Sequence, residues 1–198
     1  MNVLRAASYR RMPWKNGGGE TSEIAASPPG ATLDTLDWRI SMAVVAQDGP
    51  FSIFPGIDRT LCILEGHGMQ LDFGEDGGKR TITRDTTPFH FPADLPVQAR
   101  LLDGAITDLN VMSRRGRYRQ SVDRLVIDGH LTLDIAAPQS LLFCEHGAVS
   151  CAIDGQTAVQ LGVRDAASMS APPGIVKLST SHSSAAVYLI QLYPAASA

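Results

Sequence analysis

The stretch Gly49–Phe73, GPFSIFPGIDRTLCILEGHGMQLDF, decides the fold of this 198-residue chain. Two short apolar runs flank the turn dipeptide Pro55-Gly56, and the second run, Leu61–Leu64, leads through a glycine-containing turn into a third run that begins at Met69. Glycine and proline separate strands in this way because they interrupt regular pairing and favour turns. We therefore predict strand, turn, strand, turn, strand across this stretch.

The same pattern recurs 80 residues later in the chain. Leu61–Glu65 (LCILE) aligns with Leu141–Glu145 (LLFCE) without a gap, and Asp48-Gly49 aligns with Asp128-Gly129 at the same offset. Apolar runs and turns that recur at a fixed spacing indicate an internal repeat. Because no stretch longer than about ten residues has helical apolar periodicity, we predict a mainly β chain in which one antiparallel sandwich or jelly-roll unit occurs twice.

Composition excludes several classes of function. The formal net charge of −3 and the pI near 5.9 give no reason to expect nucleic acid. The one dense basic cluster, Ser113–Arg119, is typical of a solvated linker and only sometimes of an anion site. The N-terminus lacks the apolar core of a signal peptide, and no apolar run reaches membrane-spanning length. The three cysteines lie in apolar runs without metal-type spacing. We therefore expect a cytoplasmic protein with no nucleic-acid or membrane partner.

Four segments carry a resemblance to a known family: PWKNGGGETSEIA, WRISMA, GPFSIFPGIDRTLCILEG and DLNVMSRRG. In this order they resemble the signature segments of the HutD/Ves family, closely through residue 116 and more loosely to the C-terminus. The resemblance implies a bicupin, that is, two fused jelly-roll (RmlC-like) β-barrels. Residues 1–116 would form the N-terminal barrel with the ligand site, and residues 117–198 would form a degenerate second copy within one compact unit.

The same resemblance implies an association with histidine utilisation. Members are regarded as modulators of the pathway that bind a small pathway metabolite, and no secure enzymatic activity accompanies the resemblance. We therefore expect a binding protein rather than an enzyme.

The cupin resemblance allows a test for metal ligands. Metal-binding cupins carry a His-x-His, Glu and Gly pattern that is followed later by another His. When this pattern is aligned on Gly66, its ligand positions fall on Ser52, Phe54 and Arg59, and the later position falls on Val97. A metal site needs three or four converging His, Cys or carboxylate side chains. We therefore predict no metal and no cofactor.

Arg59 stands where a metal cupin presents a carboxylate ligand. Its guanidinium is a permanent cation whose planar fork of donors matches a carboxylate. The expected ligand therefore changes from a metal cation to a small organic anion. The alternative is a structural salt bridge between Arg59 and Asp58 or Glu65.

Comparison of the two copies supplies further candidate ligand-binding residues. Positions that the second copy replaces are more easily explained by a function of the first copy: Phe54, Asp58, Arg59 and Asn110, which align with Asp134, Pro138, Gln139 and Ile190. Arg39 is kept as Arg119, and it could add a second cation or pair with Asp58.

Other candidates surround these residues. Trp14, Lys15 and Asn16 belong to the family motif and could close the mouth of a pocket, although Trp14 could instead pack between the two barrels. His90, between Phe89 and Phe91, is the histidine best placed to line a cavity. The ten expected ligand-binding residues are Arg59, Asp58, Phe54, Asn110, Arg39, Ser52, Lys15, Asn16, Trp14 and His90.

These residues favour a metal-free bicupin that binds a small carboxylate metabolite, such as urocanate or formylglutamate, and thereby buffers or reports its level. One alternative is a metal-independent cupin enzyme, an isomerase or hydrolase that acts on a small organic acid with His90 or Asp58 as acid or base. Another is a protein-interaction subunit with no ligand, which would have an exposed apolar patch and an unfilled or collapsed first barrel. A homodimer is left open.

Overall fold

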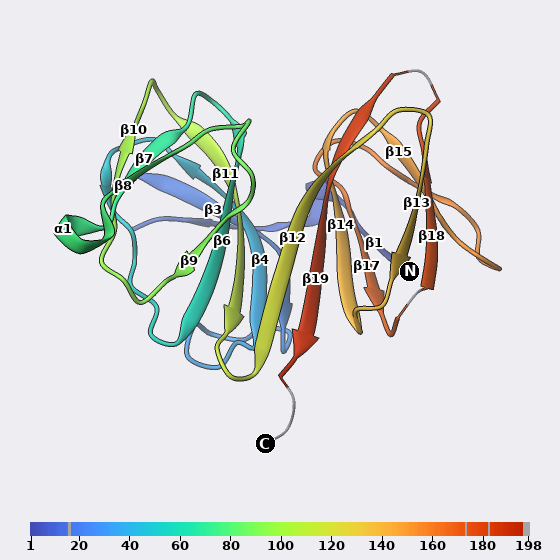
Figure 1. The fold of residues 1–198 in the computed structure, drawn as a ribbon, viewed down its shortest axis with the longest axis horizontal. Coiled ribbons are helices and arrows are strands. Elements are labelled where there is room, and N and C mark those ends of the chain that lie inside the picture. The colour runs from blue at the N-terminus through green and yellow to red at the C-terminus, as the bar shows by residue number, and fades with distance from the viewer. Residues whose placement is uncertain (16, 173, 182, 196–198) are drawn as a thin grey trace. The chain divides into compact units, whose positions relative to one another are not determined.

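The computed structural model describes residues 1–15, 17–172, 174–181 and 183–195, and its regular secondary structure is almost entirely antiparallel β-strand (Figure 1). Backbone contacts divide the chain into two units. The N-terminal unit is Arg10–Tyr118, and the C-terminal unit is Arg119–Ala198 together with Met1–Tyr9. The first nine residues, expected in the N-terminal barrel, therefore belong to the C-terminal unit, where β1 (Asn2–Leu4) pairs with β17 (Ala166–Ser170).

The N-terminal unit contains two sheets. In spatial order the six-stranded sheet is β2 (Arg10–Pro13), β3 (Gly19–Ser27), β4 (Trp38–Val45), β11 (Ile106–Arg114), β6 (Ile57–Glu65) and β9 (Phe89–Pro92). The four-stranded sheet is β5 (Gly49–Pro50), β10 (Gln98–Leu101), β7 (Met69–Asp72) and β8 (Lys79–Ile82). The short helix α1 (Gly74–Gly77) occupies the connection between β7 and β8.

Both sheets of this unit contribute to one apolar core. Leu61, Ile63 and Ile106 of the larger sheet pack in a single cluster with Met69 and Leu71 of the smaller sheet. Each of these side chains is at most 1% exposed. Alternate residues of a strand face the same side, so this cluster defines the inward face of β6 and β11. The two sheets therefore lie face to face, and each ends on edge strands rather than closing on itself.

Gly66 allows the turn between β6 and β7. Its φ is +85°, and a Cβ placed there would lie 2.7 Å from the carbonyl oxygen of Ala105. Because glycine alone adopts this backbone region without steric cost, β6 can turn directly into β7 beside the start of β11.

The C-terminal unit also contains two sheets. In spatial order the five-stranded sheet is β1, β17, β14 (Gln139–His146), β19 (Ala185–Pro194) and β12 (Tyr118–Ile127), where β12 begins at the boundary residue Tyr118. The four-stranded sheet is β13 (His130–Ile135), β18 (Gly174–Ser179), β15 (Val149–Ile153) and β16 (Val159–Leu161). The short 3-10 helix η1 (Ala6–Ser8) follows β1.

The strand order of one unit recurs in the other. The order β4-β11-β6-β9 returns as β12-β19-β14-β17, and β5-β10-β7-β8 returns as β13-β18-β15-β16. The repeat read from the sequence therefore corresponds to a repeated strand arrangement. The N-terminal unit has two additional strands, β2 and β3, at the β4 edge of its larger sheet.

The ungapped offset of 80 residues is nevertheless out of phase within β6 and β14. Leu61 and Ile63 face the core of the N-terminal unit, whereas the inward residues of β14 are Leu142 and Cys144. Leu141, the aligned partner of Leu61, is therefore on the opposite face, because a slip of one residue exchanges the two faces of a strand. Counted from the core, Arg59 corresponds to Ser140 and not to Gln139.

No helix within the described part of the chain is long and apolar enough to cross a membrane.

Candidate functional site

A cavity of about 500 Å³ lies within the N-terminal unit. Its walls come from β4, β6 and β11 of the larger sheet, from β10 of the smaller sheet, and from the segments before β3 and after β4. The residues that line it are Trp14, Lys15, Gly18, Thr21, Arg39, Ser41, Ala43, Val45, Gln47, Asp48, Gly49, Pro50, Phe51, Ser52, Phe54, Arg59, Ala99, Asp108, Asn110 and Met112.

Strand register places the polar residues of this cavity on one face. Met112 of β11 is paired with Arg39 of β4 on one side and with Arg59 of β6 on the other. Two residues earlier, Asn110 is paired with Ser41. Residues directly opposite in an antiparallel pair point to the same side, so the polar groups of three strands meet in one cavity.

Arg59 is the most deeply buried cation of the site. Its side chain is 8% exposed, and its Nε has no hydrogen-bond partner among the described residues. The guanidinium carbon lies 5.1 Å from the ring centre of Phe51, 5.2 Å from Phe54 and 6.0 Å from Phe91. These contacts offset part of the cost of burying a charge. Burial lowers the pKa of Arg59 to about 10, although the carboxyl of Asp108 acts in the opposite direction. Arg59 therefore remains a cation at neutral pH.

Asp108 brings an acid into the same cavity. It is 2% exposed, and its Oδ1 accepts a hydrogen bond from Nδ2 of Asn110. Burial raises the pKa of Asp108 to about 7, although the positive charge of Arg59 and the hydrogen bond from Asn110 act in the opposite direction. Such a group changes its protonation state near physiological pH.

Arg39 is already neutralised by a neighbouring strand. Its Nε donates to Oε2 of Glu23 on β3 at 2.9 Å, and Arg10 donates to the other oxygen of the same carboxylate at 3.2 Å. The positive charge available to an anion at the buried end of the cavity is therefore that of Arg59.

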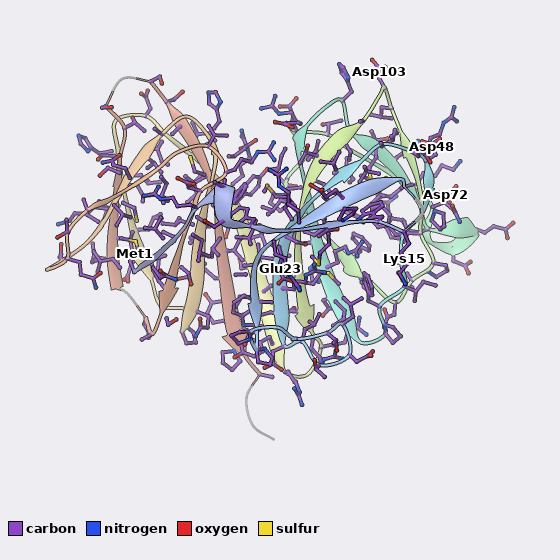
Figure 2. The ribbon with its side chains drawn as sticks, turned by 180° about the vertical axis from the view of Figure 1, so that it is seen from behind. Met1, Lys15, Glu23, Asp48, Asp72 and Asp103 are labelled. Carbon is purple, nitrogen blue, oxygen red and sulfur yellow. The ribbon has the colours of Figure 1, made fainter. Side chains whose placement is uncertain are left out.

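The mouth of the cavity is formed by the segment before β3 and the loop after β4. Trp14 donates its indole N–H to Oγ1 of Thr21 at 2.8 Å, which holds its ring against Gly19. Exposed Lys15 and Asp48 also line the cavity. In Figure 2 they lie toward the right of the N-terminal unit, whereas Glu23 lies toward its left.

A family model with the description HutD matches residues 6–188. The chain belongs to the HutD family. An uncharacterised 21.2 kDa protein from the hutC 3′ region of Pseudomonas putida is 36% identical over 165 residues, which are 83% of this chain and 84% of the relative. Protein Ves from Citrobacter koseri is 44% identical over 117 residues, which are 57% of this chain and 59% of the relative.

Solved structures agree with this assignment to the HutD family. A conserved protein of unknown function from Pseudomonas aeruginosa PAO1 has a TM-score of 0.89 and 36% identity, with 97% of this chain and 98% of that chain covered. The structure of HutD from Pseudomonas fluorescens in a formate condition has a TM-score of 0.81 and 31% identity. The match covers 98% of this chain and 99% of that chain. A cupin 2 conserved barrel domain protein from Leptotrichia buccalis has a TM-score of 0.59, 12% identity, and 92% and 95% coverage, and shows a cupin-like fold alone.

Seven of the ten residues expected from the sequence of this HutD-family chain line the cavity: Trp14, Lys15, Arg39, Ser52, Phe54, Arg59 and Asn110. Trp14 lies at the mouth of the cavity, where its indole N–H donates a hydrogen bond to Thr21. Asn16 lies outside the described residues.

Asp58 and His90 do not line the cavity. Asp58 alternates with Arg59 on β6, and its carboxylate accepts from Arg115 Nη2 at 2.7 Å. The alternative in which Arg59 forms a salt bridge with Asp58 is therefore wrong, as is the suggested pairing of Arg39 with Asp58. His90 is exposed on β9, where its Nδ1 lies 3.1 Å from Oγ1 of Thr60. Neither residue is positioned as an acid or base for a ligand in this cavity.

Sequence reasoning missed Asp108 and Phe51. The signal for Asp108 was present, because Asp108 shares a face of its strand with Asn110, and an acid in an otherwise apolar strand requires an explanation. Phe51 carries no such signal, since an aromatic residue in a loop is most simply read as core.

The donor set of this HutD-family cavity does not suit a metal ion. Across the described ranges, no group of three or more His, Cys, Asp or Glu side chains could hold one. The positions that would carry metal ligands in the cupin pattern, Ser52, Phe54 and Arg59, all line the cavity. A cation and an aromatic ring occupy two of these three positions. Neither group ligates a metal, and the cation favours an anion.

Proposed function

We propose that the cavity of the N-terminal unit binds a small carboxylate metabolite. The observation that carries this proposal is Arg59, a buried cation at the wall of a cavity, whose Nε lacks a hydrogen-bond partner in the described structure. A buried donor without a partner is costly, and a charge that is buried and unpaired costs more. A bound carboxylate would accept from the guanidinium and remove both costs.

The remaining lining residues fit such a ligand. Ser41 and Asn110 offer hydrogen-bonding groups beside the cation, whereas Phe51, Phe54 and Trp14 offer apolar surface to the body of the molecule. Small-molecule sites typically have volumes of about 300–1,000 Å³ with few polar groups, and the cavity of about 500 Å³ is within this range. Such a cavity argues against the collapsed form of the first barrel that a protein-interaction subunit could have, but not against the unfilled form.

Membership of the HutD family suggests the metabolic context. We propose a role in histidine utilisation, with urocanate or formylglutamate as candidate ligands and with binding that buffers or reports their level. Both compounds are small carboxylates. The formate condition named for the Pseudomonas fluorescens protein involves the smallest member of the same chemical class.

We also propose that the two units are the two jelly rolls of a metal-free bicupin. The recurrence of the strand order supports this, as does the cupin-like fold of more distant structures. The first unit would carry the ligand, and the second would be a copy without a buried cation at the equivalent position, which is Ser140 when counted from the core.

Isothermal titration calorimetry with urocanate and formylglutamate tests the carboxylate site. Arg59→Met retains an apolar chain against the phenylalanine rings but removes the charge, and Arg59→Ala removes both. We expect each variant to lose at least about tenfold in affinity, because a hydrogen bond to a charged group contributes about 1.5–3 kcal/mol. Arg80→Ala, an exposed arginine on β8, is the matched control and should bind like the parent. If both Arg59 variants bound the two compounds with the parental affinity, the proposed carboxylate site would be contradicted.

A metal-independent enzyme is the second candidate, and one observation favours it. Asp108 is a buried acid in the cavity with a pKa near neutrality, which suits proton transfer to or from a bound acid. Asp108 would take the role for which Asp58 and His90 were first considered. Incubation of the protein with each compound, followed by proton NMR, separates the two functions, because only an enzyme converts its ligand.

A further inference from the structure

Asp108 and Arg59 line the same cavity from neighbouring strands but do not form an ion pair. Each influences the charge of the other. Within the described structure, however, the Asp108 carboxylate accepts a side-chain hydrogen bond from Asn110, and Nε of Arg59 has no partner. The two groups therefore influence each other electrostatically, and both line the cavity that a ligand would enter.

The charged surroundings of Asp108 are few. Arg59 of β6 and Arg39 of β4 line the same cavity as Asp108, and Arg39 is neutralised by Glu23 of β3. Lys15 and Asp48 lie at the mouth of the cavity. The four-stranded sheet contributes Gly49 and Pro50 of β5 and Ala99 of β10 to the described lining of the cavity. None of these three residues is charged. Burial is the main influence on the ionisation of Asp108, and Arg59 is the charged group that favours its ionised form.

A carboxylate bound to Arg59 changes this balance in two ways. It neutralises the cation that favours the ionised form of Asp108, and it places a second negative charge in the cavity beside the buried carboxyl of Asp108. Two carboxylates that share a buried site cannot both be ionised without a large energetic cost. A protonated Asp108 instead gains an O–H donor that can be directed at the incoming anion.

We propose that Asp108 is the second recognition group of the site: in its protonated form it donates a hydrogen bond to the carboxylate that Arg59 binds, so that one proton enters the cavity with each anion. This inference rests on the proposed carboxylate site and specifies its chemistry. The favoured ligand is a monoanionic carboxylate at this end of the cavity, and its affinity falls about tenfold for each pH unit above the pH at which Asp108 loses its proton.

Carbon-detected NMR titration of the Asp108 carboxyl group, in the full-length protein with and without formate, tests the proposal. Formate is the probe because it has a carboxylate and no other functional group. The signal is assigned by its loss in Asp108→Asn, and the Nε–H signal of Arg59 reports formate binding independently. We expect formate to move the midpoint of the Asp108 titration upward by at least one pH unit.

Three results are distinguishable. An upward shift of the Asp108 midpoint supports the proposal. A formate response at Arg59 without any change at Asp108 overturns the proposal and leaves the carboxylate site intact. The absence of a response at both groups overturns the proposal together with the proposed function.

The variant Asp108→Asn gives a second measurement. Asparagine keeps a donor at this position and cannot ionise, so formate affinity should be retained near pH 6 and should lose its decline toward pH 8, within the range in which Asp108 titrates. Asp103→Asn, which changes an exposed acid in the loop between β10 and β11, is the matched control and should keep the parental pH dependence. An Asp108→Asn protein with the parental pH dependence would contradict the proposal.

Discussion

Arg39 and Glu23 form an ion pair of 2.9 Å between β4 and β3, with side chains that are only 17% and 16% exposed. This pair determines which arginine of the cavity is available to a ligand. Because Glu23 also accepts from Arg10, the carboxylate holds two cations at the edge of the site.

Replacing Glu23 by glutamine should therefore have two measurable effects. Arg39 would keep its charge and lose its counter-ion, so the free energy of unfolding should fall by about 1–3 kcal/mol, less than for a fully buried pair. Urea denaturation measures this loss. The released positive charge should also tighten carboxylate binding in calorimetry. Unchanged stability would indicate that water already solvates Arg39 well.

Gly19 is required where β3 approaches β4. A Cβ at this position would lie 2.1 Å from the carbonyl oxygen of Val44 and 3.0 Å from the ring of Trp14. Gly19→Ala should displace backbone and tryptophan together and lower the free energy of unfolding by about 1–3 kcal/mol. Thermal unfolding measures the effect. Gly49→Ala is the control because no atom lies within 4 Å of a Cβ built there, and it should unfold near the parental temperature.

Asp108 should make the stability of the folded protein depend on pH. Its pKa is raised from about 3.9 in an unfolded chain to about 7 in the fold, so between these values the native state holds a proton that the unfolded chain has released. This stabilisation is present at low pH and is lost as pH rises through neutrality. Relative to Asp108→Asn, the parent should lose about 2–3 kcal/mol between about pH 5 and pH 8. Chemical denaturation at both pH values measures the difference, and parallel pH profiles would contradict the assignment.

Asp58 should matter for stability and not for binding. It pairs with Arg115 at 2.7 Å, and Arg115 also reaches Asp94 at 3.0 Å, so this arginine ties β6 to the loop after β9. Asp58→Asn should cost about 0.5–1 kcal/mol, as expected of a partly exposed pair, and should leave calorimetric titrations with urocanate unchanged. A large loss of affinity in Asp58→Asn would instead show that Asp58 contributes to ligand binding.

Strand alternation explains which parts of the site could be predicted from the sequence. Asp58 and Arg59 are consecutive residues of one strand and must point to opposite faces, so they could not both line one cavity. His90 is excluded in the same way, because its neighbour Phe91 belongs to the core. Of the three strands predicted across Gly49–Phe73, the second and third correspond to β6 and β7. The first apolar run, Phe51–Phe54, forms no strand, and only Gly49–Pro50 pairs there, as β5.

The relation between the two copies could not be predicted in the same way. Met69 and Leu71 of β7 and Val149 and Cys151 of β15 agree in facing at an offset of 80, whereas β6 and β14 do not. The ladder of β6 with β11 shifts register between Thr107 and Asp108, and that of β14 with β19 shifts between Cys144 and His146. Such bulges move a strand by one residue without leaving a gap in an alignment.

This difference in phase decides how an engineer could install a second guanidinium in the other half of the molecule. Copying Arg59 to its aligned position would give Gln139→Arg, whose side chain would leave by the face that points away from the core of that unit. Ser140→Arg is the substitution that points inward. Ser140 is 3% exposed, and its hydroxyl has no hydrogen-bond partner in the described structure. Transplantation of the site must therefore follow the direction of each side chain and not the match of letters.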